Sequence, residues 1–203
     1  MIILPNFDEN IYPITENGVI YNSPKELVLN TFGGLNSTVL DKICYKKFSS
    51  FLQQAPKLEE ISFPYTYQYV EDETNKNKIA IENELKNIQI YLSCEQTIYH
   101  GGLLPIFIAK IGETFKVFKL FSASIDPYTA SMHAIQKEPE HWLWIIKLKN
   151  KTRIFPVQID GQEECEVIIL DGLDVKITDI KHLTKTNKMG FTLEINCVFL
   201  EQI

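Results

Sequence analysis

Two carboxylates, Glu164 and Glu166, are the residues of this sequence whose type and spacing best suit catalysis. They stand before an apolar run at residues 167–170. Residues two apart on a β-strand point to the same face, so a strand here would put both carboxylates on one face and turn Cys165 to the other. Such a pair can polarise a sugar hydroxyl and orient or deprotonate a nucleophile. Taken alone, however, such a segment is more often a solvated acidic turn.

Two further segments carry polar side chains at the ends of expected strands. Residues 99–102, Tyr-His-Gly-Gly, close a short β-prone run. Residues 122–124, Ser-Ala-Ser, lie between an alternating strand and a helical stretch that begins after Asp126-Pro127. Each segment has an ordinary structural explanation, because a histidine at a strand end is usually structural and serines commonly cap helices. Their order and spacing ahead of Glu166 suggest a shared functional role.

The three segments together resemble the motifs of the mono-ADP-ribosyltransferase family, in its arginine–serine–glutamate, toxin-like branch. That pattern runs Tyr-Arg-Gly, then aromatic-x-Ser-Thr-Ser before a helix, then Glu-x-Glu leading into a hydrophobic strand. The resemblance covers roughly residues 79–203. It implies that NAD is the substrate and that ADP-ribose passes to an acceptor while nicotinamide is released.

For the chemistry, the resemblance implies a catalytic set of Glu166, Glu164 and Ser122. Glu166 would hydrogen-bond the 2′-hydroxyl of the nicotinamide ribose. It would also stabilise the positive charge that develops as nicotinamide departs, as a carboxylate does in glycoside hydrolysis. Ser122 would hold Glu166 in its working rotamer. Glu164 matches the glutamate that accompanies arginine as acceptor, since a guanidinium with a pKa of about 12.5 or more needs a carboxylate to orient and deprotonate it.

For the nucleotide, the resemblance implies contacts from Tyr99, His100, Gly101, Gly102 and Ser124. The backbone of Gly101 would meet the nicotinamide carboxamide, where a residue without a side chain suits close approach. His100 departs from the pattern, because this branch has arginine there; histidine is typical of the diphtheria-toxin-like and poly-ADP-ribosyl-transferring branch. Histidine can donate to a ribose hydroxyl but lacks the two-pronged grip of arginine on phosphate.

The elements that must position these residues are predicted to form an α+β fold. N-terminal helices precede a mixed, mostly antiparallel two-sheet core of the ADP-ribosyltransferase type. Residues 1–22 are expected to be extended or turn-rich, and residues 61–70 are β-prone, although Pro64 argues against an internal strand. Helices are expected from Ser23 to Gly33-Gly34, from 37 to before Pro56, at 79–91 and at 128–136. Strands are expected at 97–99, 115–121, 142–148, 154–159, 166–170, 175–177 and 191–200.

Length and composition favour one domain. At 203 residues and 45% apolar content, the chain is long enough for one core and short for two domains. We therefore predict a single ADP-ribosyltransferase domain over residues 1–203, mainly helical at 1–94 and with a β-rich NAD-binding core at 95–203.

Charge and hydropathy narrow the partners and the location. The net charge of −6 argues against a nucleic-acid partner, although a local basic patch stays compatible with it. Apolar runs are too short to span a bilayer, and residues 1–5 lack the features of a signal peptide. A cytoplasmic location is therefore expected, in the host cytoplasm if the chain comes from a virus, phage or bacterial effector.

Cysteines and histidines give no sign of a metal site. The cysteines are scattered, without a Cys-x-x-Cys pair, and are expected to be reduced, mostly core thiols. They are Cys44, Cys94, Cys165 and Cys197. The histidines show no metal-ligand spacing, so no metal is expected. They are His100, His133, His141 and His182.

The predicted function is mono-ADP-ribosyl transfer from NAD to a protein acceptor, on arginine. Two alternatives stay open from the sequence. One is a related enzyme, either a transferase that modifies a nucleic-acid base or a glycohydrolase that only cleaves NAD. The other is a non-catalytic nucleotide-binding or interaction domain that kept the fold.

Overall fold

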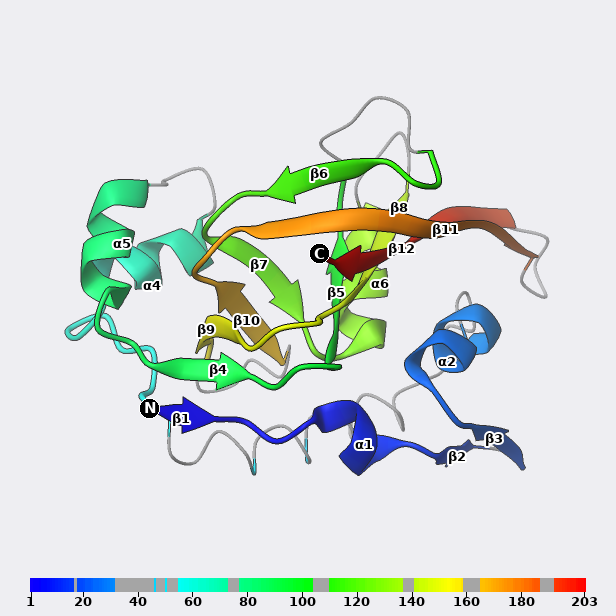
Figure 1. The fold of residues 1–203 in the computed structure, drawn as a ribbon, viewed down its shortest axis with the longest axis horizontal. Coiled ribbons are helices and arrows are strands. Elements are labelled where there is room, and N and C mark those ends of the chain that lie inside the picture. The colour runs from blue at the N-terminus through cyan, green and yellow to red at the C-terminus, as the bar shows by residue number, and fades with distance from the viewer. Residues whose placement is uncertain are drawn as a thin grey trace.

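A computed structural model gives the fold of the chain (Figure 1). It describes residues 1–16, 18–31, 46, 50, 55–72, 77–103, 110–136, 141–158, 165–186 and 192–203. The helix expected from residue 37 to Pro56, the Gly33-Gly34 stop and Glu164 therefore lie outside the described residues, apart from isolated positions of that helix.

In the part of the chain that the structure describes, ten strands pair into one mixed sheet and two more form a small ribbon. In sheet order the ten are β1 (Ile2–Ile3), β4 (Ile90–Leu92), β9 (Thr152–Pro156), β10 (Glu166–Ile169), β7 (Phe121–Ser124), β5 (Thr97–Gly101), β8 (Trp142–Lys147), β12 (Thr192–Gln202), β11 (Leu173–Thr186) and β6 (Thr114–Val117). Only β1–β4 and β8–β12 are parallel among these pairs of described strands. The ribbon joins β2 (Ile14–Glu16) to β3 (Val19–Tyr21). The α+β class and the mostly antiparallel pairing are confirmed.

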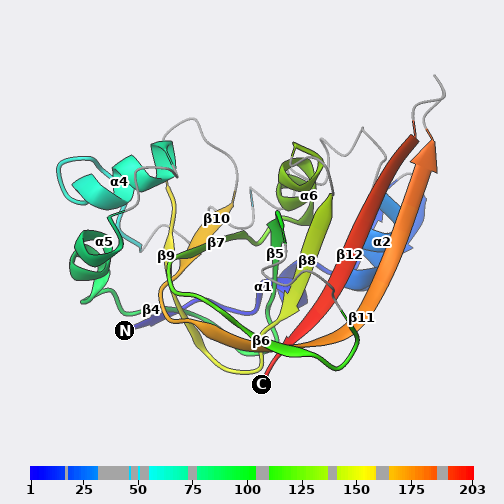
Figure 2. The same cartoon turned by 90° about the horizontal axis from the view of Figure 1, so that it is seen from above.

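The large sheet curls over the main apolar core. The edge made by β6 and the start of β11 lies across that core from β7 and β10 (Figures 1 and 2). Val117 and Val175 from one side share a single buried cluster with Ile98 and Val167 from the other. The two expected layers are thus present, but hydrogen bonding connects them into one continuous sheet.

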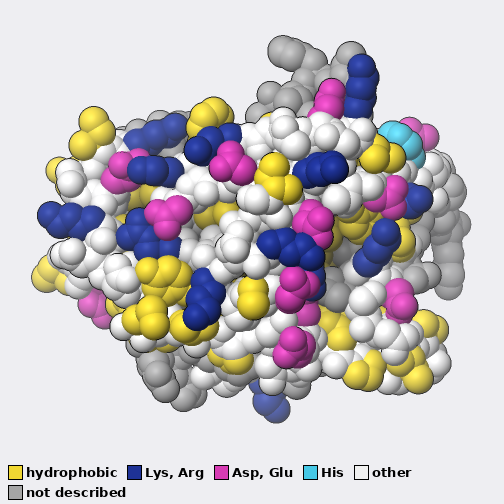
Figure 3. Space-filling model, viewed as in Figure 1, with side chains coloured by type: hydrophobic (Ala, Val, Ile, Leu, Met, Phe, Trp, Pro, Cys, Tyr) yellow, Lys and Arg dark blue, Asp and Glu magenta, His cyan; other side chains and the backbone are white. Residues whose placement is uncertain are grey.

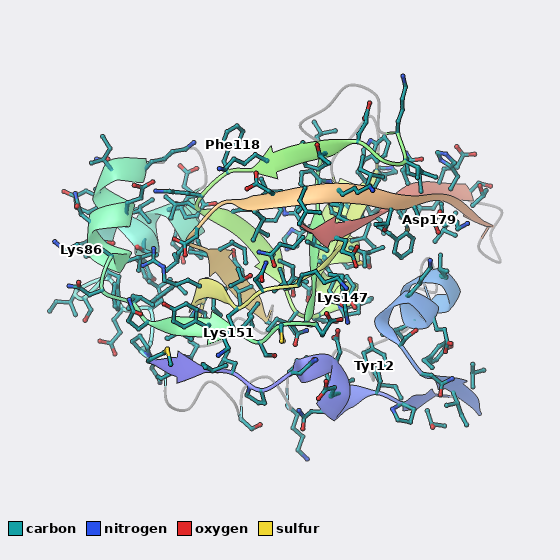
Figure 4. All side chains as sticks on the ribbon, viewed as in Figure 1. Tyr12, Lys86, Phe118, Lys147, Lys151 and Asp179 are labelled. Carbon is teal, nitrogen blue, oxygen red and sulfur yellow. The ribbon has the colours of Figure 1, made fainter. Side chains whose placement is uncertain are left out.

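Five described helices cover the sheet: α1 (Phe7–Ile11), α2 (Pro24–Thr31), α4 (Pro64–Glu71), α5 (Lys78–Leu85) and α6 (Pro127–Gln136). α4 and α5 lie together at one end of the molecule (Figure 2), where Tyr69 and Leu85 pack with Phe155 and Ile168. α6 packs against β5 and β8 through Ala130 and Ala134. α2 lies beside β11, where Lys25 Nζ is 3.2 Å from Asp179 Oδ2 (Figure 4).

The helix expected from Ser23 is confirmed as α2. Ser23 Oγ accepts a hydrogen bond from the backbone N–H of Glu26 at 3.2 Å, as an N-cap serine does. The Glu26 carboxylate reaches back one residue further than a capping box requires and accepts from the N–H of Asn22 at 2.8 Å.

Residues 61–70 are the clearest departure from the predicted elements, because most of this β-prone segment is helix α4. Pro64 starts the helix, where its missing N–H costs nothing. The carboxylate of Glu84 on α5 accepts from the N–H groups of Tyr65 and Thr66, each at 2.9 Å. A cap supplied from a distant helix leaves no local signal in the sequence.

Three further boundaries differ from expectation. The helix expected at 79–91 ends at Leu85, and Ile90–Leu92 is strand β4, held between β1 and β9. The strand expected at 115–121 breaks into β6 and β7 at Leu120, whose φ is 58°. The N-terminal lead-in contains helix α1, capped by the side chain of Asn6. None of the described helices has the length and apolarity that a membrane crossing demands.

Candidate active site

A cavity of about 460 Å³ opens where β5, β7, β10 and α6 meet. All three sequence segments singled out above contribute to its wall. The lining residues are Val70, Tyr99, His100, Gly101, Gly102, Leu103, Ser122, Ala123, Ser124, Thr129, Ala130, His133 and Glu166. The volume lies in the range of small-molecule and cofactor sites, about 300–1,000 Å³.

Glu166 and Ser122 meet through the register of β10 against β7. Glu166 stands opposite Ser124, so Ser122 is its diagonal neighbour on the same face of the sheet. The Ser122 hydroxyl donates a short hydrogen bond to Glu166 Oε1. Both side chains are only partly buried, so the carboxylate is held in place at the cavity wall while remaining reachable by a ligand.

A hydrogen bond from one nitrogen of its ring holds His100 next to this pair. Nδ1 lies 2.8 Å from the carbonyl oxygen of Ser122, and a carbonyl can only accept, so Nδ1 carries a proton. The ring packs against Phe121 and Trp144, with centroids 4.5 and 5.2 Å away. In the neutral imidazole, Nε2 is therefore the acceptor, and in the protonated ring it is a second donor.

The two glycines of this segment have different neighbours. A Cβ on Gly101 would lie 2.1 Å from the carbonyl oxygen of Ala130 and 2.3 Å from the nitrogen of Ala134, so Gly101 is needed for β5 to pack against α6. A Cβ on Gly102 would lie 2.6 Å from His100 Nε2. Gly102 thus leaves room for the histidine, and its carbonyl is held by the Trp144 Nε1–H at 3.1 Å.

Tyr99 and Ser124 line the cavity but are almost wholly buried, at 1% and 5% exposure. Tyr99 packs with Ala130 and Leu143 between β5 and α6. Ser124 Oγ accepts from the N–H of Asp126 at 2.9 Å and lies 3.4 Å from the Cys165 carbonyl. Ser124 therefore fastens the end of β7 to the start of α6 and to the residue before β10.

The strand that would put Glu164 and Glu166 on one face does not extend to Cys165. Strand β10 begins at Glu166, and Cys165 has a φ of 50°, outside the strand conformation. Cys165 is nonetheless buried, as expected, and so is Cys197, whose burial raises its pKa to about 12. Cys94 is exposed, so two of the three described cysteines are buried, in line with the expectation of mostly core thiols.

Sequence reasoning missed several residues of the site. Asp126 is fully buried and caps α6: its carboxylate accepts from the N–H of Tyr128 at 2.9 Å and from the Thr129 hydroxyl at 3.0 Å. The signal was available, because Asp-Pro before a helical stretch is typical of a helix start. His133 follows Thr129 by four residues on α6 and lines the same cavity. Within the described ranges, no group of His, Cys, Asp or Glu could hold a metal ion.

Comparison with known proteins gives likenesses of fold. No protein-family model and no curated protein matches this sequence. The enzymatic component C2-I of the Clostridium botulinum C2 toxin is 13% identical, with a TM-score of 0.50 over 78% of this chain and 46% of that chain. The ADP-ribosyltransferase Vis from Vibrio splendidus, in complex with agmatine, is 14% identical, with a TM-score of 0.52 over 81% of this chain and 85% of that chain.

A third solved structure is BECa, an ADP-ribosylating toxin of a binary enterotoxin of C. perfringens, in complex with NADH. It is 15% identical, with a TM-score of 0.53 over 94% of this chain and 54% of that chain. The chain thus spans about half the length of C2-I and BECa. At these identities the likeness concerns the fold, and it confirms the fold that the three sequence motifs implied.

Proposed function

We propose that this chain, which has the fold of the ADP-ribosyltransferases, is a mono-ADP-ribosyltransferase that moves ADP-ribose from NAD to a protein acceptor. The observation that carries the proposal is the Ser122–Glu166 hydrogen bond at the wall of a cavity also lined by His100. A carboxylate held by a hydroxyl, partly exposed in a cavity of cofactor size, is what glycosidic bond cleavage needs.

The reaction requires a carboxylate at the ribose. The bond from ribose C1′ to the nicotinamide nitrogen breaks with its electron pair leaving on nicotinamide, and positive charge develops on the ribose. Glu166 offsets that charge, and because Ser122 already orients it, little reorganisation is needed during the reaction. A new bond from C1′ to the acceptor nitrogen follows, and the acceptor loses a proton.

The chemistry of the cavity wall fits NAD. Gly101 and Gly102 contribute backbone to this wall, and the space that their side chains would take is filled by α6 at Gly101 and by the His100 ring at Gly102. His100 Nε2 can bond a hydroxyl or a phosphate oxygen. Tyr99 and Ser124 contribute by shaping the wall between β5, β7 and α6.

For the acceptor we propose arginine, activated by Glu164. Two lines support this: the Glu-x-Glu spacing of residues 164–166, and the complex of the Vis transferase with agmatine, a compound that ends in a guanidinium. Residues 95–203 would supply the NAD-binding core of a single domain, acting in the cytoplasm, of a host if the chain is a phage or bacterial effector.

One assay tests the proposal against its alternatives. The protein is incubated with labelled NAD and a cell lysate, as wild type, as Glu166→Gln and as Glu194→Gln. Glu194 is an exposed strand glutamate outside the cavity, so its variant controls for loss of a carboxylate. We expect labelled protein with the wild type and Glu194→Gln, and a loss of about 10²–10³-fold with Glu166→Gln.

Other products would point to other functions. Nicotinamide release without labelled macromolecule indicates a glycohydrolase, and label in nucleic acid indicates base modification. Lysine and acidic side chains are interspersed on the face drawn in Figure 3, so the described side chains of that face form no continuous basic surface for nucleic acid. NAD binding without any turnover would refute the proposal that the protein is an enzyme.

The variant Glu164→Gln distinguishes the roles proposed for the two glutamates. If Glu164 activates the acceptor, this variant should keep NAD hydrolysis and lose transfer to arginine. Hydrolysis and transfer falling together would contradict the role given to Glu164. The comparison with Glu166→Gln, which should lose both, is made in the same assay.

A further inference from the structure

The described wall of the cavity holds few charges. Glu166 is the only carboxylate among the described lining residues, and no lysine or arginine occurs among them. The basic side chains of the wall are the imidazoles of His100 and His133. NAD brings a diphosphate, and burying its negative charge without a cationic partner is costly.

Arginine is scarce throughout this chain. Arg153 is the sole arginine of the sequence. Its guanidinium forms a two-pronged pair with Asp171, Nε to Oδ2 at 3.1 Å and Nη2 to Oδ1 at 2.7 Å, and donates to the Lys86 carbonyl. It does not line the cavity, so it offers the diphosphate nothing.

The N-terminus of α6 is also occupied. Such an end attracts anions because its N–H groups are unpaired and its dipole is positive. Here the buried carboxylate of Asp126 already takes the N–H of Tyr128 and the Thr129 hydroxyl. That carboxylate neutralises the helix end that would otherwise bind a phosphate.

The two imidazoles approach the cavity from different elements. His100 lies on β5, with Nδ1 bonded to the Ser122 carbonyl and Nε2 beside Gly102. His133 is an exposed residue of α6, one turn after Thr129. A protonated imidazole donates charge-assisted hydrogen bonds to phosphate oxygens, which are stronger than neutral ones.

We propose that His133, acting with His100, binds the diphosphate of NAD. This assignment rests on the NAD-dependent function proposed above. Its consequence is that NAD affinity follows the protonation of imidazole: binding is tight below about pH 6 and weakens as the pH rises toward 8.

The titratable and charged groups that can influence these imidazoles lie on α6 and on the elements packed against it. They are Tyr99 and His100 of β5, Lys147 of β8, which pairs with Glu95 at 3.4 Å, and His141 just before β8, whose Nδ1 lies 3.1 Å from the carbonyl oxygen of Ala134 on α6. Across the cavity stands Glu166 of β10, and Asp126 caps α6 itself.

The test measures binding instead of turnover. NADH is the probe, because its neutral dihydronicotinamide is a poor leaving group and the complex is stable. Dihydronicotinamide riboside, which lacks the diphosphate, is the matched ligand. Dissociation constants are measured at pH 6 and pH 8 for the wild type, His133→Gln, His133→Arg and His182→Gln. His182 is an exposed histidine of β11 outside the cavity.

We expect the wild type and His182→Gln to bind NADH about tenfold more tightly at pH 6 than at pH 8. His133→Gln should weaken NADH binding about tenfold at pH 6 and reduce the pH dependence to the part that His100 supplies, with riboside binding unchanged. His133→Arg should bind NADH more tightly than the wild type at pH 8, because arginine stays charged.

Three outcomes would overturn the assignment. Wild-type affinity and pH dependence in His133→Gln would exclude His133 from diphosphate binding while leaving the proposed function intact. Equal weakening of NADH and the riboside would mean that the substitution alters the shape of the cavity. No NADH binding by the wild type would refute the proposed function itself, and this assignment with it.

Discussion

Ser122 and Glu166 show how one hydroxyl can prepare one carboxylate for chemistry. The Ser122–Glu166 hydrogen bond holds the Glu166 side chain in a single orientation at the cavity wall. Without it, the carboxylate would sample other rotamers, and only a fraction of molecules would present it correctly.

We therefore predict that Ser122→Ala lowers kcat by about tenfold with little change in KM, because binding is kept and transition-state stabilisation is reduced. Initial-rate kinetics of nicotinamide release would measure this. Ser131→Ala is the control, since the Ser131 hydroxyl bonds the Tyr128 carbonyl within α6 and does not line the cavity. A rise in KM with unchanged kcat would assign Ser122 to substrate binding instead.

The neighbouring glycines should give different phenotypes. In Gly101→Ala the new methyl would meet backbone atoms of α6 at 2.1 and 2.3 Å, which cannot move separately, so we expect a loss of about 3 kcal/mol or more in unfolding free energy. In Gly102→Ala the methyl would meet the side-chain ring of His100 at 2.6 Å instead of backbone, so we expect a smaller loss of stability than in Gly101→Ala, together with weakened NADH binding.

Denaturant titration and NADH binding of both variants would test this pair. Gly112→Ala is a control for backbone strain, because its φ is 94° and no atom of the described residues lies within 4 Å of the new methyl. It should cost about 1 kcal/mol. A Gly101→Ala protein as stable as Gly112→Ala would contradict the packing of β5 against α6.

At the site, the sequence motifs were sufficient to bring together Glu166, Ser122 and His100, because strand register places motif residues on one face. The motifs did not predict that Gly101 packs against a helix, because that helix lies about thirty residues further along the chain. The positive φ of Cys165 could not be predicted from the sequence pattern either, since a non-glycine residue rarely adopts one.

Among the elements, α1 is tied to the sheet by a buried polar cluster. The Asp8 carboxylate accepts from the N–H of Thr97 at 2.8 Å and from Gln96 Nε2 at 3.1 Å. Burial raises the pKa of Asp8 and outweighs these hydrogen bonds, which lower it. The pKa therefore rises from 3.8 to about 6. Between these two values the folded state holds a proton that the unfolded state has lost.

Asp8 therefore makes the folded state less stable as the pH rises from about 4 to 6, by at most about 3 kcal/mol. We predict that Asp8→Asn gains stability relative to the wild type across this window and that the difference is constant above it. Denaturation midpoints between pH 4 and 8 would measure this. Glu9→Gln, an exposed carboxylate on the same helix, should show no such window; an equal slope in both variants would contradict the assignment to Asp8.

The elements that sequence patterns predicted best are those with local signals. α2 has its serine cap and Pro24, and β8 is a continuous apolar run. α4 was missed because its first N–H groups are satisfied by Glu84 on another helix. The strand β4 was missed because its short apolar run continues the helical spacing of α5, and only its partners β1 and β9 make it a strand.

For the molecule as a whole, the scarcity of arginine bears on the acceptor. A transferase that modifies arginine could also modify itself, but here its only arginine is Arg153. The side chain of Arg153 is 22% exposed, and the hydrogen bonds that it donates to Asp171 raise the pKa of its guanidinium further. A guanidinium that is paired and harder to deprotonate is a poor nucleophile.

We predict that the wild type, incubated with NAD, acquires no arginine-linked ADP-ribose, whereas Asp171→Ala, which removes the carboxylate paired with Arg153, does so. Lys151→Arg, which adds an arginine at an exposed position between β8 and β9 (Figure 4), should also be modified. Asp174→Ala removes an exposed carboxylate of β11 that is not paired with Arg153 and should behave as the wild type. Peptide mass spectrometry locates the modification.

Wild-type labelling at Arg153 equal to that of Asp171→Ala would show that the ion pair does not protect the guanidinium. Labelling of a lysine, serine or glutamate in all four proteins would overturn arginine as the acceptor, while leaving the cleavage chemistry of Glu166 standing.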